Sequence, residues 1–256
     1  MNTKKQIVEN WLPRYTGVKL KDFGRYILLT NFDRYVELFA RWHKVPVHGR
    51  GKPMLNATAG GITIINFGMG SATAATIMDL LTAIRPKAVL FLGKCGGLKH
   101  RAKIGSLILP IAAIRGEGAS NDYFPPEVPA LPAFALQKAI STTIRDHHCD
   151  YWTGTVYTTN RRVWEHDSVF KKYLKRIRVI AIDMETATIF TTGFANGIVA
   201  GALLLVSDEP MTPEGVKTAD SDRKVDEEHV NMHIRIGIDS LKQLINNGVT
   251  VKHLQF

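Results

Sequence analysis

The sequence contains only two cysteines, Cys95 and Cys149, and no long hydrophobic run. Two cysteines cannot form the disulfide framework of a small secreted domain, so we expect a reduced, cytoplasmic protein. No apolar segment reaches the roughly 18–20 residues of a membrane-spanning helix. Residues 1–15 also lack the apolar stretch of about 7–15 residues found in secretory signals. The sequence therefore predicts neither a membrane protein nor a secreted one.

Glycine, proline and charge are not present in the excess that marks a fibrous or disordered chain. The 256 residues include 21 glycines and 11 prolines, and 45% of all residues are hydrophobic. This composition excludes collagen-like, coiled-coil and disordered proteins, and the length allows a large core without metal or disulfide support. No linker and no internal repeat interrupt the pattern. We expect one domain over residues 1–256, with residues 1–23 as an N-terminal extension.

The familiar cofactor motifs are incomplete. Gly68-Met69-Gly70 follows a predicted strand, but Thr73 stands where a dinucleotide-binding turn has its third glycine. Gly93-Lys94 lacks the earlier glycine of a phosphate-binding P-loop, because that position is Ala88. We therefore expect no nucleotide cofactor.

Metal-ligand spacing is absent as well. The cluster His147-His148-Cys149 has no second pair of ligands, and His229 and His233 stand four residues apart without the glutamate of a zinc protease helix. No G-x-S-x-G segment marks a serine hydrolase. The sequence predicts no metal site.

The net charge of +10 raises the question of nucleic-acid binding. Residues 161–178 hold seven Lys and Arg against two acidic residues, and their spacing predicts an amphipathic helix with an apolar side formed by Val169, Phe170, Tyr173 and Leu174. No zinc-finger spacing, aromatic RNA-binding signature or arginine-rich tail accompanies this charge. Steering of a small anionic substrate into a cleft explains a basic protein equally well.

Short apolar runs alternate with helical patterns along most of the chain. The runs predict strands at 26–30, 62–67, 88–92, within 104–114, and at 151–158, 178–182 and 198–207. Helical spacing predicts helices at 32–42, from a Ser71 cap to 84, at 131–147, at 161–178, from about 183, and at 225–245, with a polar loop at 115–129. Because strands this apolar must be covered on both faces, we expect an α/β domain with a central mixed β-sheet flanked by helices.

Polar chemistry follows three of the predicted strands, at the ends where ligands bind in open α/β sheets. The three segments are Gly93–Gly97 with one lysine among glycines, Ile182–Glu185 with two acids, and Val206–Asp208 with one acid. Each segment alone has an ordinary structural explanation as a tight turn, a helix-terminal acid or a strand-end cap. Their occurrence together predicts a site for an anionic ligand.

Read in this order, the three segments resemble the purine nucleoside phosphorylase and nucleosidase family. Gly93–Gly96 is similar to its G-S-x-G loop, Asp183–Ala187 to its E-M-E-A-x motif, and Val206–Asp208 to its catalytic Ser-Asp pair. Within the family, Ile114–Phe124 and Gly215–Thr218 resemble the members that hydrolyse AMP. Because longer members of that group carry an additional N-terminal regulatory domain, we expect a short form confined to the catalytic domain.

The resemblance implies hydrolysis of AMP to adenine and ribose 5-phosphate, without a cofactor. It implies that Asp208 protonates or hydrogen-bonds purine N7 and that Glu185 holds the ribose 2′- and 3′-hydroxyls. Met184 would pack against the sugar and Tyr157 would stack on the base. These residue types suit the reaction, because cleavage of an N-glycosidic bond builds positive charge on the sugar and negative charge on the leaving purine.

The departures from the family pattern concern phosphate. Phe91 stands where the phosphorylases of the family have a phosphate-binding arginine, and Lys94 replaces the loop serine. The change favours water over phosphate as the attacking group. Arg34 and Lys94 are the first candidates to contact the 5′-phosphate or an inhibitory phosphate. Arg115 and Lys217 are weaker ones, and exposed structural cations are the alternative for all four. Glu117 is a guess for the residue that activates water.

Two alternatives to the hydrolase remain open. Arg34, Glu185 and Asp208 would also serve a phosphate-dependent phosphorylase acting on 6-aminopurine nucleosides. The charge alone would suit a non-catalytic nucleotide- or RNA-binding protein. Relatives assemble as homo-oligomers, often hexamers built as trimers of dimers, so the resemblance implies a homo-oligomer with AMP as its small-molecule partner and with neither nucleic acid nor membrane.

Overall fold

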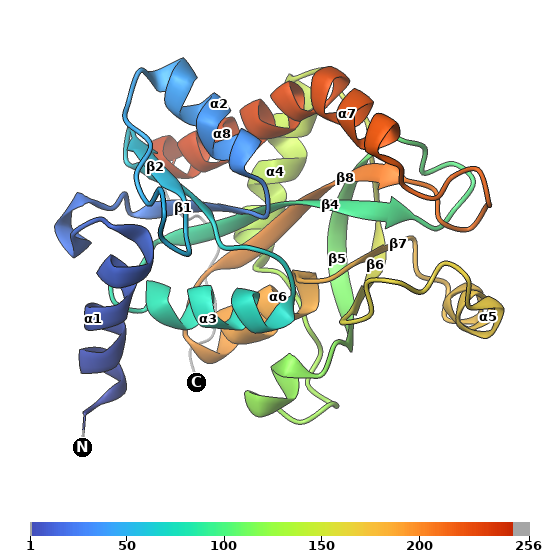
Figure 1. Cartoon of the computed structure of the whole chain (residues 1–256), viewed down its shortest axis with the longest axis horizontal. Helices are drawn as coiled ribbons and strands as arrows, with labels where there is room; N and C mark the ends of the chain where they lie inside the picture. The colour runs from blue at the N-terminus through green and yellow to red at the C-terminus, as the bar shows by residue number, and fades with distance from the viewer. Residues whose placement is uncertain (1, 248–256) are drawn as a thin grey trace.

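The computed structural model describes residues 2–247, which form a mixed β-sheet with helices on both faces (Figure 1). The strands run in the order β2-β3-β1-β4-β7-β6-β5-β8, and β4 also pairs with β8. They are β1 (Tyr26–Thr30), β2 (Asn56–Ala59), β3 (Ile62–Asn66), β4 (Ala88–Gly97), β5 (Leu107–Gly116), β6 (Tyr151–Thr159), β7 (Ala181–Asp183) and β8 (Ala200–Asp208). The predicted fold class, an α/β domain with a central mixed sheet, is confirmed.

Strand β4 joins two parts of the sheet. It pairs with β1 and β8 in parallel and with β7 in the antiparallel sense. Because β7, β6, β5 and β8 follow one another and β8 returns to β4, these five strands close into a ring. The other three strands extend outward from β4 as an open sheet. All ten residues of β4 are buried, which explains its almost continuous apolar sequence.

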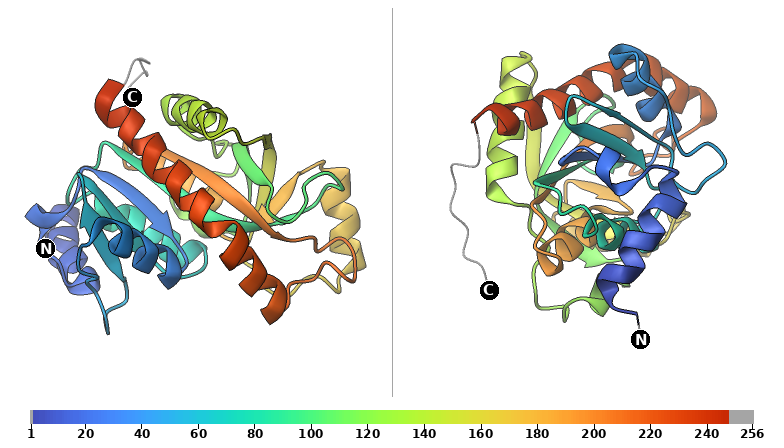
Figure 2. Two further views of the ribbon diagram at one scale, coloured as in Figure 1. Left: turned by 90° about the horizontal axis from the view of Figure 1, so that it is seen from above. Right: turned by 90° about the vertical axis from the view of Figure 1, so that its left-hand side faces the viewer.

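Helices cover the two faces in two groups (Figure 1). One group is α1 (Lys4–Thr16), α3 (Ser71–Leu81) and α6 (Thr186–Ala195), and the other is α2 (Asp33–His43), α4 (Phe134–Asp146), α7 (Ala219–Glu228) and α8 (Val230–Asn247). Seen from above, α8 crosses the sheet obliquely, and α5 (Ser168–Arg176) stands at one end of the molecule (Figure 2). Among the described residues, no helix has the length and apolar character needed to span a bilayer.

Two helix predictions were wrong in their boundaries. The basic helix predicted at 161–178 begins only at Ser168, because the Asp167 side chain caps it by accepting the backbone N–H of Phe170 at 2.9 Å. Val169, predicted on its apolar side, is exposed. The long helix predicted at 225–245 is two helices, α7 and α8, that meet at His229.

The predicted Ser71 cap was also wrong. Gly70 occupies the cap position with φ +95°, and Ser71 is the first helical residue. Its hydroxyl is used elsewhere, as a donor to the backbone carbonyl of Met184 at 2.6 Å.

The segment Gly93–Gly97, expected to follow the strand as a glycine loop, continues β4 because strands β8 and β7 pair with it on both sides. The predicted strand 178–182 shortens to β7, and a 3₁₀ helix, η2 (Ala119–Asp122), lies within the predicted loop 115–129. A second 3₁₀ helix, η1, spans Leu20–Asp22. Helix α1 and strand β2 were not predicted, because neither segment has a clear apolar period.

A buried histidine connects α2, α8 and β8. The carbonyl oxygen of Leu203 can only accept, so the contact of 2.9 Å places the His233 proton on Nε2. Nδ1 then accepts the hydroxyl of Tyr35, also at 2.9 Å. Burial lowers the pKa of His233 to about 4, so the imidazole is neutral in the folded protein at neutral pH.

This histidine makes stability depend on pH. Its folded-state pKa lies below the unfolded value of about 6.5, so its contribution is complete above pH 6.5 and is lost as the pH falls toward 4. Between pH 7 and pH 5 this group should lower the free energy of unfolding by about 2 kcal/mol. Urea titrations of the wild type and of His233→Gln at both values check this, because only the wild type carries this loss between pH 7 and pH 5. A stability difference between the two proteins that is the same at both pH values would contradict it.

Candidate active site

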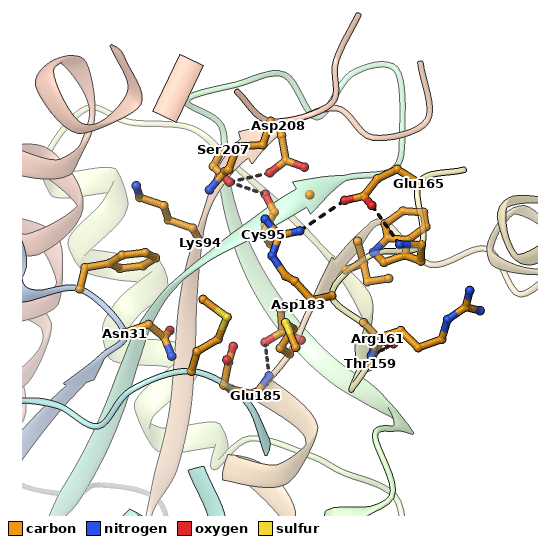
Figure 3. Close-up of a pocket in the computed structure, with 18 residues that line it drawn as sticks. Asn31, Lys94, Cys95, Thr159, Arg161, Glu165, Asp183, Glu185, Ser207 and Asp208 are labelled. Atoms are coloured by element: carbon orange, nitrogen blue, oxygen red, sulfur yellow. Dashed lines mark hydrogen bonds and ion pairs between the residues drawn. The ribbon is translucent and has the colours of Figure 1, made fainter. Parts of the chain in front are cut away.

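One pocket collects the ends of six strands. It is lined by residues that follow β1 and β3, by Lys94–Gly96 of β4, by residues after β6 between 159 and 165, by Ile182–Glu185, by Ser207 and Asp208, and by Lys217 (Figure 3). The three segments that the sequence analysis singled out therefore meet in one place. They do so because the strands that carry them are neighbours within the ring.

A β-bulge sets the position of Asp208. Cys95 of β4 pairs with Val206 of β8, but the next residue, Gly96, pairs with Asp208, so Ser207 is the extra residue. Such a bulge re-aims the side chains at a strand end, and both Ser207 and Asp208 line the pocket. The Ser207 hydroxyl donates to the Asp208 carboxylate at 2.7 Å. Burial nevertheless raises the pKa of Asp208, although Ser207, Lys217 and Arg162 oppose the rise.

The turn between β7 and α6 is organised by Asp183. Its buried carboxylate accepts the backbone N–H of Thr186 at 2.7 Å and that of Glu185 at 3.2 Å. Its other oxygen accepts the hydroxyl of Thr158 at 2.7 Å. Asp183 therefore accepts the first backbone N–H of α6 and fixes the backbone on which Met184 and Glu185 are presented to the pocket. The sequence predicts a start of this helix near Asp183, but α6 begins at Thr186.

Glu185 is 4% exposed and lines the pocket. The backbone N–H of Gly70, at the start of α3, donates to its carboxylate at 2.6 Å. Burial, and then the charge of Asp183, raise the pKa of Glu185 to about 8. At neutral pH the carboxyl group is thus mostly protonated until a ligand supplies donors that favour its ionised form.

The segment between β6 and α5 carries pocket residues that sequence reasoning placed on a helix. Arg161, Arg162, Trp164 and Glu165 all line the pocket. Tyr157, the aromatic residue predicted to stack on a base, does not line it. Instead, the Tyr157 ring packs edge-on against Phe170 and Tyr173 of α5. Trp164 is the aromatic side chain of this segment that reaches the pocket wall.

Lys94 lines the pocket, but its charge is already engaged. Its side chain is 3% exposed, and its ammonium group lies 2.7 Å from Asp222 and 2.7 Å from Asp226 of α7. It also lies 4.5 Å from the centre of the Phe32 ring. Lys217 approaches the same oxygen of Asp222 at 3.1 Å. In Figure 3 the Lys94 side chain points away from Asp208 and Glu185. Lys94 therefore anchors α7 to β4.

Three other predicted residues lie outside the pocket lining. Arg34 is exposed on α2. Arg115 donates to the carbonyl oxygens of Phe124, Pro125 and Val128 and thereby holds the 116–128 loop. Glu117, the guess for water activation, is buried where it accepts the Thr188 hydroxyl at 2.7 Å. The contacts of Arg115 and Glu117 are those of residues that shape this loop.

Sequence reasoning missed Asn31, Arg161, Arg162, Trp164 and Glu165 as pocket residues. The available signal was Asp167, a strong helix-capping residue in the middle of the predicted helix. A helix that begins after Asp167 leaves 161–166 as a segment free to line a site. Across residues 2–247, no group of three or more His, Cys, Asp or Glu side chains is arranged to hold a metal ion.

The chain is similar to known proteins over nearly its whole length. A model of the phosphorylase superfamily matches residues 25–242. The AMP nucleosidase of Escherichia coli (strain K12) is 29% identical over 283 residues, which cover 93% of this chain and 58% of that protein. The chain thus matches a little over half of that relative's length. The uridine phosphorylase of Treponema pallidum (strain Nichols) is 24% identical, covering 90% of this chain and 93% of that protein.

Solved structures give a consistent result. The crystal structure of AMP nucleosidase from Bacteroides thetaiotaomicron VPI-5482 superimposes with a TM-score of 0.87 at 56% sequence identity, covering 96% of this chain and 99% of that chain. Uridine phosphorylase from Vibrio fischeri ES114 has a TM-score of 0.76 at 21% identity, covering 88% and 94%. The second likeness supports the shared fold alone.

Proposed function

The chain belongs to the phosphorylase superfamily, and we propose that it is an N-glycosidase that hydrolyses AMP to adenine and ribose 5-phosphate. The observation that carries the proposal is the pair of carboxyl groups, Asp208 and Glu185, which line one pocket with raised pKa values. The similarity of the chain to the AMP nucleosidases of E. coli and B. thetaiotaomicron supports AMP as the substrate.

The two carboxyl groups suit the two charges of the transition state. Asp208, whose pKa burial raises, donates the proton of its acid form to N7 as the bond to the sugar breaks, so adenine leaves as a neutral molecule. Glu185, ionised by the bound ribose, accepts its 2′- and 3′-hydroxyls and stabilises positive charge on the sugar. Met184 packs against the sugar, and Trp164 rather than Tyr157 contacts the base. Water then adds to the anomeric carbon and loses a proton to the solvent.

Hydrolysis is favoured over phosphorolysis by the charges at β4. Phe91, where a phosphate-binding arginine would stand, is fully buried and packs against Phe67. Lys94 meets two carboxylates, so it offers little uncompensated positive charge to inorganic phosphate. The second candidate function, a phosphorylase of 6-aminopurine nucleosides, keeps some support because the uridine phosphorylases share the fold and the same two acids would serve it.

A product assay tests the proposal. The protein is incubated with AMP or adenosine, with and without inorganic phosphate, and the sugar products are separated. We expect adenine and ribose 5-phosphate from AMP at a rate that does not require phosphate. An absolute requirement for phosphate, with a sugar 1-phosphate as product, would instead establish the phosphorylase. Steeply salt-dependent binding to oligonucleotides, with no base released from any substrate, would establish the nucleic-acid binder.

The 5′-phosphate is proposed to contact Lys217. This lysine lines the pocket, has one carboxylate neighbour at 3.1 Å, and keeps 21% of its side chain exposed. Lys94, by contrast, is enclosed by two carboxylates. Inorganic phosphate would compete for the same lysine as an inhibitor.

A matched pair of variants checks this assignment. Lys217→Met should raise KM for AMP at least tenfold more than KM for adenosine, because only AMP carries the phosphate. Lys94→Met removes the same charge but should affect both substrates alike. It should also lower the free energy of unfolding by about 2 kcal/mol, since it removes the cation beside Asp226 and leaves Asp222 with Lys217 alone. A rise in KM for AMP alone in Lys94→Met would instead assign the 5′-phosphate contact to Lys94.

The oligomeric state and the cellular compartment are also proposed. We propose a cytoplasmic homo-oligomer, a hexamer built as a trimer of dimers. Met69, which is 59% exposed beside the pocket, is one apolar side chain that such an interface would cover. Light scattering of the purified protein measures the assembly directly.

A further inference from the structure

The segment of residues 160–167 places side chains at the pocket that the proposed reaction does not use. Among them, Arg162 and Glu165 line the pocket together with Asp208. In Figure 3, Glu165 and Asp208 lie on one side of the pocket and Glu185 lies on the opposite side. In the proposed function, on which this inference rests, the sugar lies at Glu185 and the purine at Asp208. Glu165 therefore faces the purine.

The Glu165 carboxylate is held in place from two directions. One oxygen accepts the backbone N–H of Trp164 at 3.0 Å, and the other accepts the guanidinium group of Arg162 at 3.4 Å. Its side chain is 16% exposed, whereas that of Arg162 is 55% exposed. A carboxylate has about four lone-pair positions, and these two contacts use only two. Glu165 is thus oriented and still able to accept a further hydrogen bond.

The hydrogen-bonding groups on the edge of the purine determine which base can donate to the Glu165 carboxylate. Adenine presents N7 and its 6-amino group on one edge, as an acceptor beside a donor. If Asp208 approaches N7, the 6-substituent lies next to it, on the side where Glu165 stands. A 6-amino group donates to a carboxylate, but a 6-oxo group would place oxygen against oxygen. We propose that Glu165, oriented by Arg162, selects 6-aminopurine nucleotides over 6-oxopurine nucleotides.

The test compares AMP with its 6-oxo counterpart, IMP. We measure kcat/KM for base release from both nucleotides in the wild type and in Glu165→Gln. The wild type should prefer AMP by at least about a hundredfold, since a site built to accept a hydrogen bond rejects a ligand that cannot donate one. Glutamine keeps the shape but presents either a carbonyl or an amide N–H₂. The preference should therefore fall at least tenfold, with a rise in the absolute value for IMP.

The rise for IMP separates recognition from damage, because a variant that merely disturbs the fold lowers both values. Glu209→Gln is the matched control. Glu209 directly follows Asp208 in the chain, contacts Lys103 at 3.0 Å and is not part of the pocket lining. Its variant should keep the wild-type preference. An unchanged preference in Glu165→Gln, or the same change in Glu209→Gln, would overturn the assignment.

Calorimetry with the free bases distinguishes this inference from the proposed function. Adenine and hypoxanthine are titrated into the wild type and Glu165→Gln, and no turnover is needed. Preferred binding of adenine that is lost in the variant supports the role of Glu165 even if AMP is not hydrolysed. Hydrolysis of AMP with an unaltered base preference in the variant overturns only the role of Glu165. A wild type that neither hydrolyses AMP nor binds adenine overturns both.

Discussion

Replacing Asp208 by asparagine is expected to lower kcat for adenine release from AMP by about 10²–10⁴-fold, while the dissociation constant for AMP changes little. Asparagine can still donate a hydrogen bond to N7, so the ground-state contact survives. It cannot transfer a proton, and a positioned general acid contributes a factor of this size. Single-turnover rates and equilibrium binding of AMP separate the two quantities. A variant with the wild-type kcat would show that another group protonates the purine.

The same group gives kcat a predictable dependence on pH. Burial raises the pKa of Asp208, so its acid form persists to a higher pH than that of an ordinary aspartate. The wild-type kcat should therefore fall as the pH rises through this elevated value, and the residual kcat of Asp208→Asn should not follow that fall. Glu209→Gln is the control for the loss of a neighbouring carboxylate. It should retain the wild-type profile, because Glu209 is absent from the pocket lining.

Replacing Glu185 by glutamine should lower kcat/KM for AMP by roughly a hundredfold, because the sugar hydroxyls then lose their charge-assisted hydrogen bonds. The effect should be smaller for 2′-deoxy-AMP, which has already lost one hydroxyl. Comparing both substrates in the wild type and in Glu185→Gln forms a double-mutant cycle between the enzyme and the sugar. Equal losses for the two substrates would show that Glu185 does not contact the 2′-hydroxyl.

Protonation of Glu185 should also be visible in binding. Its pKa in the unliganded protein is about 8, so AMP must displace a proton at neutral pH. In Asp208→Asn, which holds AMP without turning it over, affinity should increase with pH up to about 8 and then level off. Calorimetry in buffers of different ionisation enthalpy should record proton release at pH 7. The double variant Asp208→Asn/Glu185→Gln should bind AMP with no such dependence.

Glu185 should cost the unliganded protein stability at alkaline pH. Its folded-state pKa lies above the unfolded value, so its contribution is complete at low pH and is lost as the pH rises from about 4.5 toward 8. Glutamine carries no charge to bury, so Glu185→Gln should melt at a higher temperature than the wild type at pH 9 while it loses activity. This opposition between stability and function is typical of binding sites.

Much of the site could be predicted because it depends on strand ends. Apolar runs identified most strands, and polar residues that follow neighbouring strands must meet at the pocket. This reasoning placed Asp208, Glu185 and Met184 together, and all three line the same pocket. Glu165 could not be found in this way, because 161–178 has the period of one amphipathic helix. Whether that helix begins at 161 or 168 depends on a capping bond that periodicity does not register.

Long-range pairs explain the remaining differences. Lys94 looks like a free cation in the sequence, since its partners Asp222 and Asp226 lie more than a hundred residues away on α7. Tyr157 has the expected position on β6, but its ring packs against the neighbouring helix α5 and does not line the pocket. The bulge at Ser207 likewise follows from pairing between β8 and β4 and leaves no mark on either strand alone.

The threefold pairing of β4 bears on how this scaffold could be redesigned. Insertions or deletions in Ala88–Gly97 would shift the register of β1, β7 and β8 at once, so that wall of the pocket offers little room for engineering. The connection after β6 pairs with no neighbouring strand. A combinatorial library aimed at new nucleobases should therefore randomise residues 160–166 and leave the central strand and Lys217 untouched.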